Sequence, residues 1–95
     1  MRLWLDDCRP APPGWAWAKT YGEAVALLET GEVTYASLDH DLADDVLADE
    51  KTGYDVVLWM EQHDVWPRDG LDCHSMNPVG RARIEQVIRK HRRHY

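Results

Sequence analysis

The sequence predicts a small α/β fold, in which an open, mostly parallel sheet is flanked by helices. Short apolar runs typical of strands alternate with segments that carry helix start signals, and this alternation indicates parallel strands joined by helices. Three of the strand-like runs end in polar clusters, namely Asp6-Asp7, Asp39-His40-Asp41 and His74-Ser75. Because ligands bind at the carboxyl ends of the strands in such sheets, the three clusters are expected to meet at one site.

The first strand is predicted at residues 3–6, and a weaker candidate lies at 15–19. Between them is the Pro-rich segment 9–14, which cannot be helical because proline lacks a backbone N–H and clashes with the preceding turn. Neighbouring parallel strands usually need a crossover of about a dozen residues or more. Residues 15–19 are therefore either a parallel strand reached through a short loop or no strand at all.

The central elements have clear start signals. Thr20 with Glu23 three residues later forms a capping box, which opens a helix that Gly31 ends. A strand is predicted at 33–39, and an exposed acidic loop at 43–51. Thr52 with Asp55 repeats the capping box and opens a second helix.

The last strand is predicted at 71–75, and a third helix follows it. Asn77 can cap this helix, and Pro78 suits its first position because proline has no N–H to leave unpaired there. The apolar stripe of the helix has the spacing i, i+3, i+4, i+7, with Ile84, Val87, Ile88 and His91.

The composition indicates a soluble protein with one domain, residues 1–95. No apolar run approaches the roughly 20 residues of a membrane span and no leader opens the chain, so cytoplasmic residence is expected. Cys8 and Cys73 are too few for a disulfide framework, and we expect reduced thiols. Residues 1–72 carry 5 Lys or Arg against 16 Asp or Glu. Such an acidic surface would repel duplex DNA.

The acidic residues at the strand ends could hold a divalent cation. Asp6, Asp7, Asp39 and Asp41 offer the hard oxygen ligands that Mg²⁺ or Mn²⁺ prefers. Asp6 and Asp7 are expected to differ in role, because neighbouring residues of a strand point to opposite faces. The alternative is that one member of each pair only caps the following loop.

His40 and His74 are candidates for acid and base catalysis. Two imidazoles at neighbouring strand ends can act on a phosphodiester as general base and general acid, because an unperturbed pKa near 6.5 allows one to be neutral and the other protonated. Asp39 or Asp41 could orient an imidazole. The alternative is that backbone hydrogen bonds satisfy both histidines and neither takes part in chemistry.

Four residues are candidates for binding a substrate phosphate. Ser75 and Asn77 precede the third helix, whose first N–H groups can bind an anion. Arg81 opposes the helix dipole in the first turns and is expected on the sheet-facing side with Ile84, paired with Asp39, with Asp41 or with a phosphate. Arg9, which follows the first acidic pair, is the fourth candidate.

The motifs LDDCRPAP, SLDHDL, TGYD and HSMNPVGR together resemble the family of cyclic-phosphate-processing receiver domains, over residues 5–81. The resemblance implies a receiver-like, flavodoxin-like sheet. In it, Asp6 and Asp7 match the acidic pair of the first strand, and Asp39 matches an aspartate at a later strand end. The activity it implies is a phosphodiesterase that hydrolyses a cyclic nucleotide signal or a 2′,3′-cyclic RNA end. Such an enzyme would also suit a virus that destroys a cyclic-nucleotide alarm signal in the host cytoplasm.

The chain also departs from phosphate-accepting receivers. Those use a Lys at the end of a fifth strand, which has no match here, and the Pro-rich segment replaces their first helix, so a truncated receiver fold is expected. Three other functions stay open: a non-catalytic module that binds cyclic nucleotides, a degenerate phospho-accepting receiver, and a toxin-like or antitoxin-like partner protein. The sequence leaves the oligomeric state undetermined.

Overall fold

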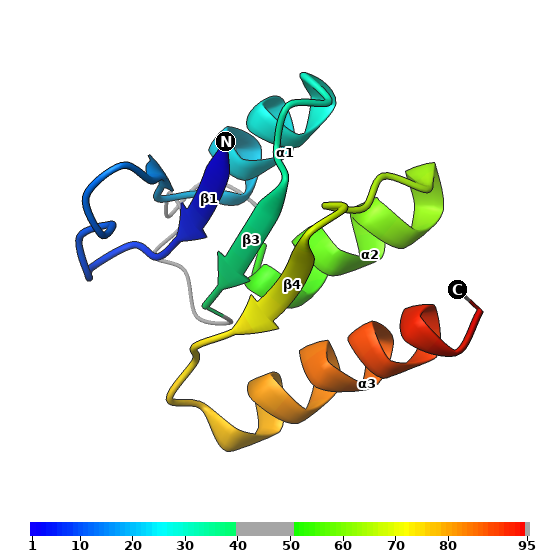
Figure 1. The fold of residues 1–95 in the computed structure, drawn as a ribbon. Helices are drawn as coiled ribbons and strands as arrows, with labels where there is room; N and C mark the ends of the chain where they lie inside the picture. Colours follow the sequence, from blue (N-terminus) through cyan, green and yellow to red (C-terminus); the bar gives the residue numbers. More distant parts are fainter. Residues whose placement is uncertain (40–50, 95) are drawn as a thin grey trace.

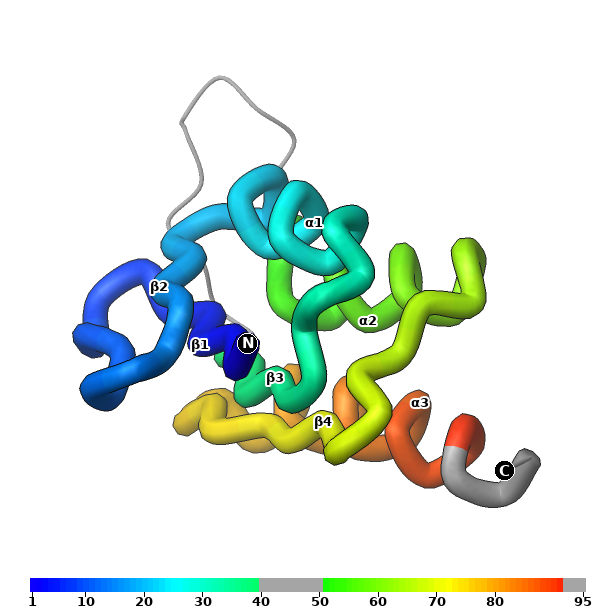
Figure 2. The backbone as a smooth tube through the Cα atoms, turned by 45° about the horizontal axis from the view of Figure 1, so that its top comes forward, coloured from blue at the N-terminus to red at the C-terminus, as the bar shows by residue number. Residues whose placement is uncertain are grey.

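The computed structural model describes residues 1–39 and 51–94. Four strands form a single parallel sheet in the order β2-β1-β3-β4. Figure 1 shows β1, β3 and β4 side by side, and Figure 2 shows β2 next to β1. The elements in chain order are β1 (Arg2–Leu5), β2 (Ala16–Ala18), α1 (Tyr21–Glu29), β3 (Tyr35–Leu38), α2 (Gly53–His63), β4 (Gly70–Cys73) and α3 (Pro78–His94). The predicted receiver-like α/β architecture is confirmed.

The weak candidate at residues 15–19 is a real strand, which lies at the edge of the sheet. β2 pairs in parallel with β1, with Leu3 opposite Ala16 and Leu5 opposite Ala18. The pairing continues one residue beyond β1, where the Asp6 amide donates to the Ala18 carbonyl at 3.0 Å. The Pro-rich loop thus makes a parallel connection without a helix, because it turns tightly, with the Trp15 amide bonded to the Pro12 carbonyl at 3.1 Å.

The other strands are shorter than predicted or shifted by a residue. β3 begins at Tyr35 rather than at residue 33, and β4 covers 70–73 rather than 71–75. The amide of Thr34 donates to the Met1 carbonyl at 2.7 Å, before the regular ladder with β1 starts. After β4, the chain turns toward α3 and leaves the ladder.

The sheet buries one face against the helices. Leu3, Leu5, Ala36 and Leu38 alternate along β1 and β3 and belong to the hydrophobic core, together with Ile84 of α3. The helix α1 lies next to α2, and α2 lies next to α3 (Figure 1, Figure 2). Residues between the core positions point to the opposite face of the sheet. Trp4 of β1 and Tyr35 of β3 lie on that face and do not belong to the core.

The helix start signals are present in the structure. Thr52 and Asp55 make a complete capping box, with both reciprocal bonds present. Thr20 caps α1 by accepting from the Glu23 amide at 3.1 Å, whereas the Glu23 carboxylate accepts from Lys19 instead of from Thr20. Across residues 1–39 and 51–94, no helix is long and apolar enough to cross a membrane.

Candidate functional site

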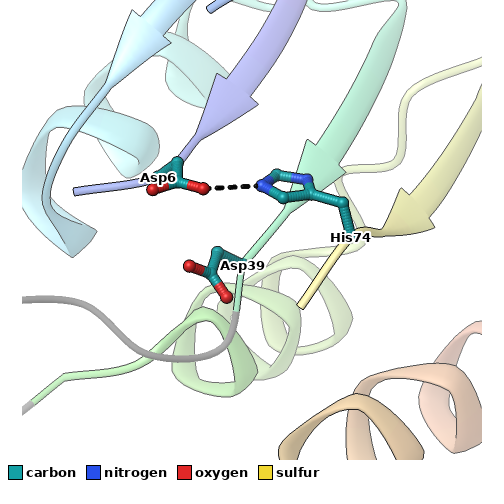
Figure 3. A group of neighbouring side chains, drawn as sticks. All are labelled: Asp6, Asp39 and His74. Atoms are coloured by element: carbon teal, nitrogen blue, oxygen red, sulfur yellow. Dashed lines mark hydrogen bonds and ion pairs between the residues drawn. The ribbon is translucent and has the colours of Figure 1, made fainter. Parts of the chain in front are cut away.

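Asp6, Asp39 and His74 meet at the carboxyl edge of the sheet (Figure 3). They directly follow the strands β1, β3 and β4, respectively. Backbone hydrogen bonds hold two of them level with the neighbouring strand, because the Asp39 amide donates to the Leu5 carbonyl and the His74 amide to the Leu38 carbonyl, both at 2.9 Å. The side chains offer ligand atoms that all lie within 4.8 Å of one another.

Asp6 is the most deeply buried member of this cluster, with 1% of its surface exposed. Its Oδ1 accepts from the amides of Cys8 and Arg9 at 2.9 and 2.8 Å, and its Oδ2 accepts from Arg9 Nε at 2.9 Å. Burial by itself would raise the pKa of Asp6, but these amide bonds, the His74 bond and the Arg9 charge outweigh it and lower the pKa. The carboxylate is therefore ionised at neutral pH.

His74 has a hydrogen-bond partner at each ring nitrogen. Nε2 lies 3.1 Å from Asp6 Oδ2, and Nδ1 lies 2.7 Å from Ser37 Oγ. Because a carboxylate only accepts, the neutral ring donates from Nε2 and accepts the Ser37 hydroxyl proton at Nδ1. Burial lowers the pKa of His74 and the Arg9 charge adds to this effect, whereas the hydrogen bond that His74 donates to Asp6 opposes it.

The imidazole of His74 also lies flat on an aromatic ring. It stacks on Trp4 with a centroid distance of 3.8 Å and an interplanar angle of 4°. Trp4 in turn donates from Nε1 to the Arg9 carbonyl at 2.9 Å. These contacts fix both the orientation of the imidazole and the path of the loop that carries Arg9.

Arg9 joins the three members of the cluster through one guanidinium. Nε bonds Asp6, while Nη2 donates to the His74 carbonyl at 3.2 Å and lies 3.8 Å from Asp39 Oδ2. The side chain is 45% exposed. It therefore presents positive charge to solvent beside the carboxylates, where a phosphate could approach.

The comparison with known protein families agrees with this geometry. The family model for the cyclic-phosphate processing receiver domain matches residues 1–90. The chain belongs to this family. The resemblance carried by the sequence motifs is thereby confirmed. No curated protein and no solved structure shows significant similarity to the chain.

The cluster of this receiver domain could hold a metal ion. Two carboxylates and one imidazole form a donor set that suits Mn²⁺, and the carboxylate oxygens also suit Mg²⁺. Of the four predicted metal ligands, Asp6 and Asp39 belong to the cluster and Asp7 does not. Asp41 and the predicted catalytic residue His40 lie outside the described residues.

Two predicted phosphate-binding residues of the receiver domain hold the start of α3. The Ser75 hydroxyl is buried and accepts from the Asn77 amide at 3.1 Å. The Asn77 side chain accepts from the amides of Val79 and Gly80, both at 3.1 Å. Asn77 is therefore the helix cap that the sequence predicted.

The expectation that Arg81 faces the sheet is wrong. Its side chain is 51% exposed, and Nε donates to Glu85 Oε1 at 2.6 Å. The pairing with Asp39 is not formed. The reason is the local helix geometry, because residues four apart are neighbours on a helix surface and Glu85 offers a partner without burial of the guanidinium.

Sequence reasoning assigned no role to Trp4 and Ser37. The register places them directly opposite each other in β1 and β3, so that the imidazole of His74 can contact both. Alternation along the strand could have shown that Ser37 shares a face with Tyr35 and Asp39. The contact with His74, however, depends on how the chain folds back after β4, which no local pattern indicates.

Proposed function

We propose that this receiver domain hydrolyses a phosphodiester bond in a cyclic phosphate, either in a cyclic nucleotide signal or at a 2′,3′-cyclic RNA end. The observation that supports the proposal is the convergence of Asp6, Asp39, His74 and Arg9 at the carboxyl edge of the sheet. These groups supply what such a reaction needs: a cation for the phosphate, a base for water, and carboxylates that orient both.

In the proposed reaction, Arg9 binds a non-bridging phosphate oxygen and His74 is the general base. The hydrogen bond between Ser37 and His74 gives a path for the proton: the attacking water gives one to the Ser37 hydroxyl, which passes its own to Nδ1. Oxygen from water then bonds to phosphorus, and the bond to the leaving ribose oxygen breaks. His40 would supply the proton that this oxygen needs.

A bound metal would change the role of His74. Asp6, Asp39 and His74 would hold Mg²⁺ or Mn²⁺, and the ion would stabilise phosphate charge and lower the pKa of a bound water. His74 would then coordinate through Nε2 and donate from Nδ1 to Ser37, whose hydroxyl can accept as well as donate. The two chemistries thus use the same residues with different tautomers of the neutral His74 imidazole.

A second candidate function is binding without hydrolysis. It is favoured by one observation, namely that both ring nitrogens of His74 are already engaged within the protein. A site that only sequesters a cyclic nucleotide would keep its imidazole in this fixed state. An enzyme must break one of these hydrogen bonds, or relay a proton along it, in each turnover.

The test is incubation of the purified protein with 3′,5′-cyclic nucleotides, 2′,3′-cyclic nucleotides and RNA with a 2′,3′-cyclic end, followed by chromatography of the products. Each reaction is run with EDTA, and again with Mg²⁺ or Mn²⁺ added. A linear monophosphate from at least one substrate supports hydrolysis. Binding of a cyclic nucleotide by calorimetry with no product in any condition would favour the binding module instead.

A further inference from the structure

The face of the sheet opposite the helices carries an aromatic cluster formed by Trp4, Trp15 and Tyr35. Trp15 meets Trp4 edge-on at 6.0 Å and Tyr35 edge-on at 5.7 Å, with interplanar angles of 87° in both pairs. The guanidinium of Arg2 lies 5.3 Å from the centre of the Trp15 ring. None of these three aromatic residues packs against the hydrophobic core.

Beside this cluster is a depression with a volume of about 560 Å³, lined by Arg2, Trp15, Thr34, Tyr35, Ser37 and Asp69. Its size falls in the range of small-molecule sites, about 300–1,000 Å³. Two aromatic rings form its apolar part. The polar groups of the lining residues are one cation, one carboxylate and three hydroxyls, so that the depression offers both donors and acceptors with no excess of positive charge.

Ser37 links the depression to the cluster of Asp6, Asp39 and His74. It lines the depression, and its hydroxyl is 2.7 Å from Nδ1 of His74. Trp4 also connects the two regions, because its ring stacks on His74 and contacts the ring of Trp15 edge-on. A ligand whose phosphate lies beside Arg9 could therefore extend over Ser37 into the depression.

We propose that this depression binds the base and ribose of the substrate, so that the receiver domain selects a nucleoside cyclic phosphate over a cyclic phosphate that lacks a base. A nucleobase has a flat face that stacks on aromatic rings and an edge with both donors and acceptors, which matches the lining. The balanced charge of Arg2 and Asp69 fits the neutral part of a nucleotide. The inference rests on the proposed function for the position of the phosphate.

The experiment compares two ligands that differ only in the base. Adenosine 2′,3′-cyclic phosphate and 1-O-methylribose 2,3-cyclic phosphate are titrated into the protein, and affinities are measured by calorimetry in EDTA with the products checked by chromatography. We expect the nucleotide to bind at least about fivefold more tightly, which is the lower end of what one base stacked on aromatic side chains contributes. Equal affinities would overturn the proposal.

Substitutions in the depression test whether its lining residues cause the preference for the ligand with a base. Trp15→Ala and the surface variant Asp69→Ala should lower affinity for the nucleotide and leave affinity for the base-free ligand unchanged. Trp66→Ala is the matched control, because Trp66 packs against the core and stacks on His91, away from the depression. If Trp15→Ala unfolds the protein, Asp69→Ala alone decides, since Asp69 is exposed. Equal loss for both ligands would contradict the proposal.

These outcomes are separable from those of the proposed function. A base-dependent affinity with no hydrolysis of any substrate would keep the nucleotide site and refute the phosphodiesterase. Hydrolysis of both ligands, bound with equal affinity, would support the phosphodiesterase and refute the nucleotide site. If a second copy of the chain occupies this face instead, light scattering will show a dimer that Trp15→Ala dissociates and that the nucleotide does not perturb, which also overturns the proposal.

Discussion

His74 is held from three sides, by Asp6, by Ser37 and by the ring of Trp4. The two kinds of contact fix different degrees of freedom. The two hydrogen bonds set the rotation of the imidazole within its plane, and the stacked indole sets the plane itself. A side chain held in this way loses little further entropy when it reacts or binds. The arrangement suits a residue that acts on a substrate rather than one that only fills space.

Replacement of His74 by Ala should lower kcat by a factor of about 10²–10⁴, the usual contribution of a general acid or base. The protein should remain folded, because His74 lies after β4 and outside the hydrophobic core. His63→Ala is the matched control, since His63 is exposed on α2 and bonds only locally, to the Trp59 carbonyl. Activity of His74→Ala within threefold of the parent would remove His74 from the mechanism.

Substitution of Arg9 and of Arg81 tests which of the two arginines binds the substrate phosphate and which only forms a surface ion pair. Arg9→Ala should raise KM for a cyclic phosphate by about tenfold or more, because a charge-assisted bond to the phosphate is lost. Arg81→Ala should leave KM and the melting temperature unchanged, because Arg81 is exposed and pairs with Glu85. The opposite ranking in steady-state kinetics would return Arg81 to the phosphate site and show that Arg9 only supports the fold.

Asp6 gives the cluster a defined pH dependence. Its pKa is lowered in the folded state, so its contribution to stability is complete above the unfolded pKa of about 3.9 and is lost as the pH falls through the folded pKa. Asp6→Asn should therefore reduce the free energy of unfolding at pH 7 by about 1–3 kcal/mol, and by progressively less as the pH falls below the unfolded pKa of about 3.9. Urea denaturation in EDTA measures both differences, and a difference independent of pH would contradict the assignment.

Among the elements, α3 connects the site with the fold through its first turn. Asn77 accepts from the amides of Val79 and Gly80, and Ser75 accepts from Asn77 in the turn before it. This turn also follows His74 directly, so that it connects the cap of the helix with the residue that carries the imidazole. Ser75 and Asn77, which sequence analysis assigned to phosphate binding, thus stabilise the start of α3.

Asn77→Ala should lower the free energy of unfolding by about 1 kcal/mol, the usual cost of a lost N-cap. Asn77→Asp keeps an acceptor at the cap and should restore stability, with a favourable interaction of its charge with the helix dipole. Thermal denaturation compares the three proteins. If Asn77 also binds phosphate, Asn77→Asp will keep the fold but raise KM, because its carboxylate repels the substrate.

At the scale of the whole molecule, the helices of the described residues 1–39 and 51–94 cover only one face of the sheet. The buried face holds the fold together through apolar contacts, whereas the other face carries aromatic and polar side chains beside the cluster of Asp6, Asp39 and His74. The cluster itself draws on three strand ends far apart in the sequence. Any ligand that binds there joins these segments, so binding and global stability are linked.

Addition of Mg²⁺ or Mn²⁺ should therefore raise the melting temperature if the cluster holds an ion, with a gain of about 2.7 kcal/mol at an ion concentration of 100 times Kd. Asp39→Asn should abolish this gain, because it removes one of the three donor groups. Ca²⁺-free buffer with EDTA provides the baseline in calorimetry. A rise that persists in Asp39→Asn would place the ion elsewhere.

The sequence by itself determined the fold class and the edge of the sheet at which the candidate site lies. Apolar runs and capping signals are local, so three helices, three strands and the positions of Asp6, Asp39 and His74 at strand ends could be predicted from them. The proline-rich connection to β2 was ambiguous, because its outcome depends on pairing with β1 rather than on local preference.

The tertiary structure alone decided which side chains touch. Register placed Trp4 opposite Ser37, and the turn after β4 brought the imidazole of His74 into contact with both, although Trp4 and His74 are 70 positions apart in the chain. The direction of Arg81 was decided by competition between Glu85 and the sheet. Contacts of this kind depend on small differences in distance and burial between distant segments, whereas the periodicity of a sequence reports only the face on which a residue lies.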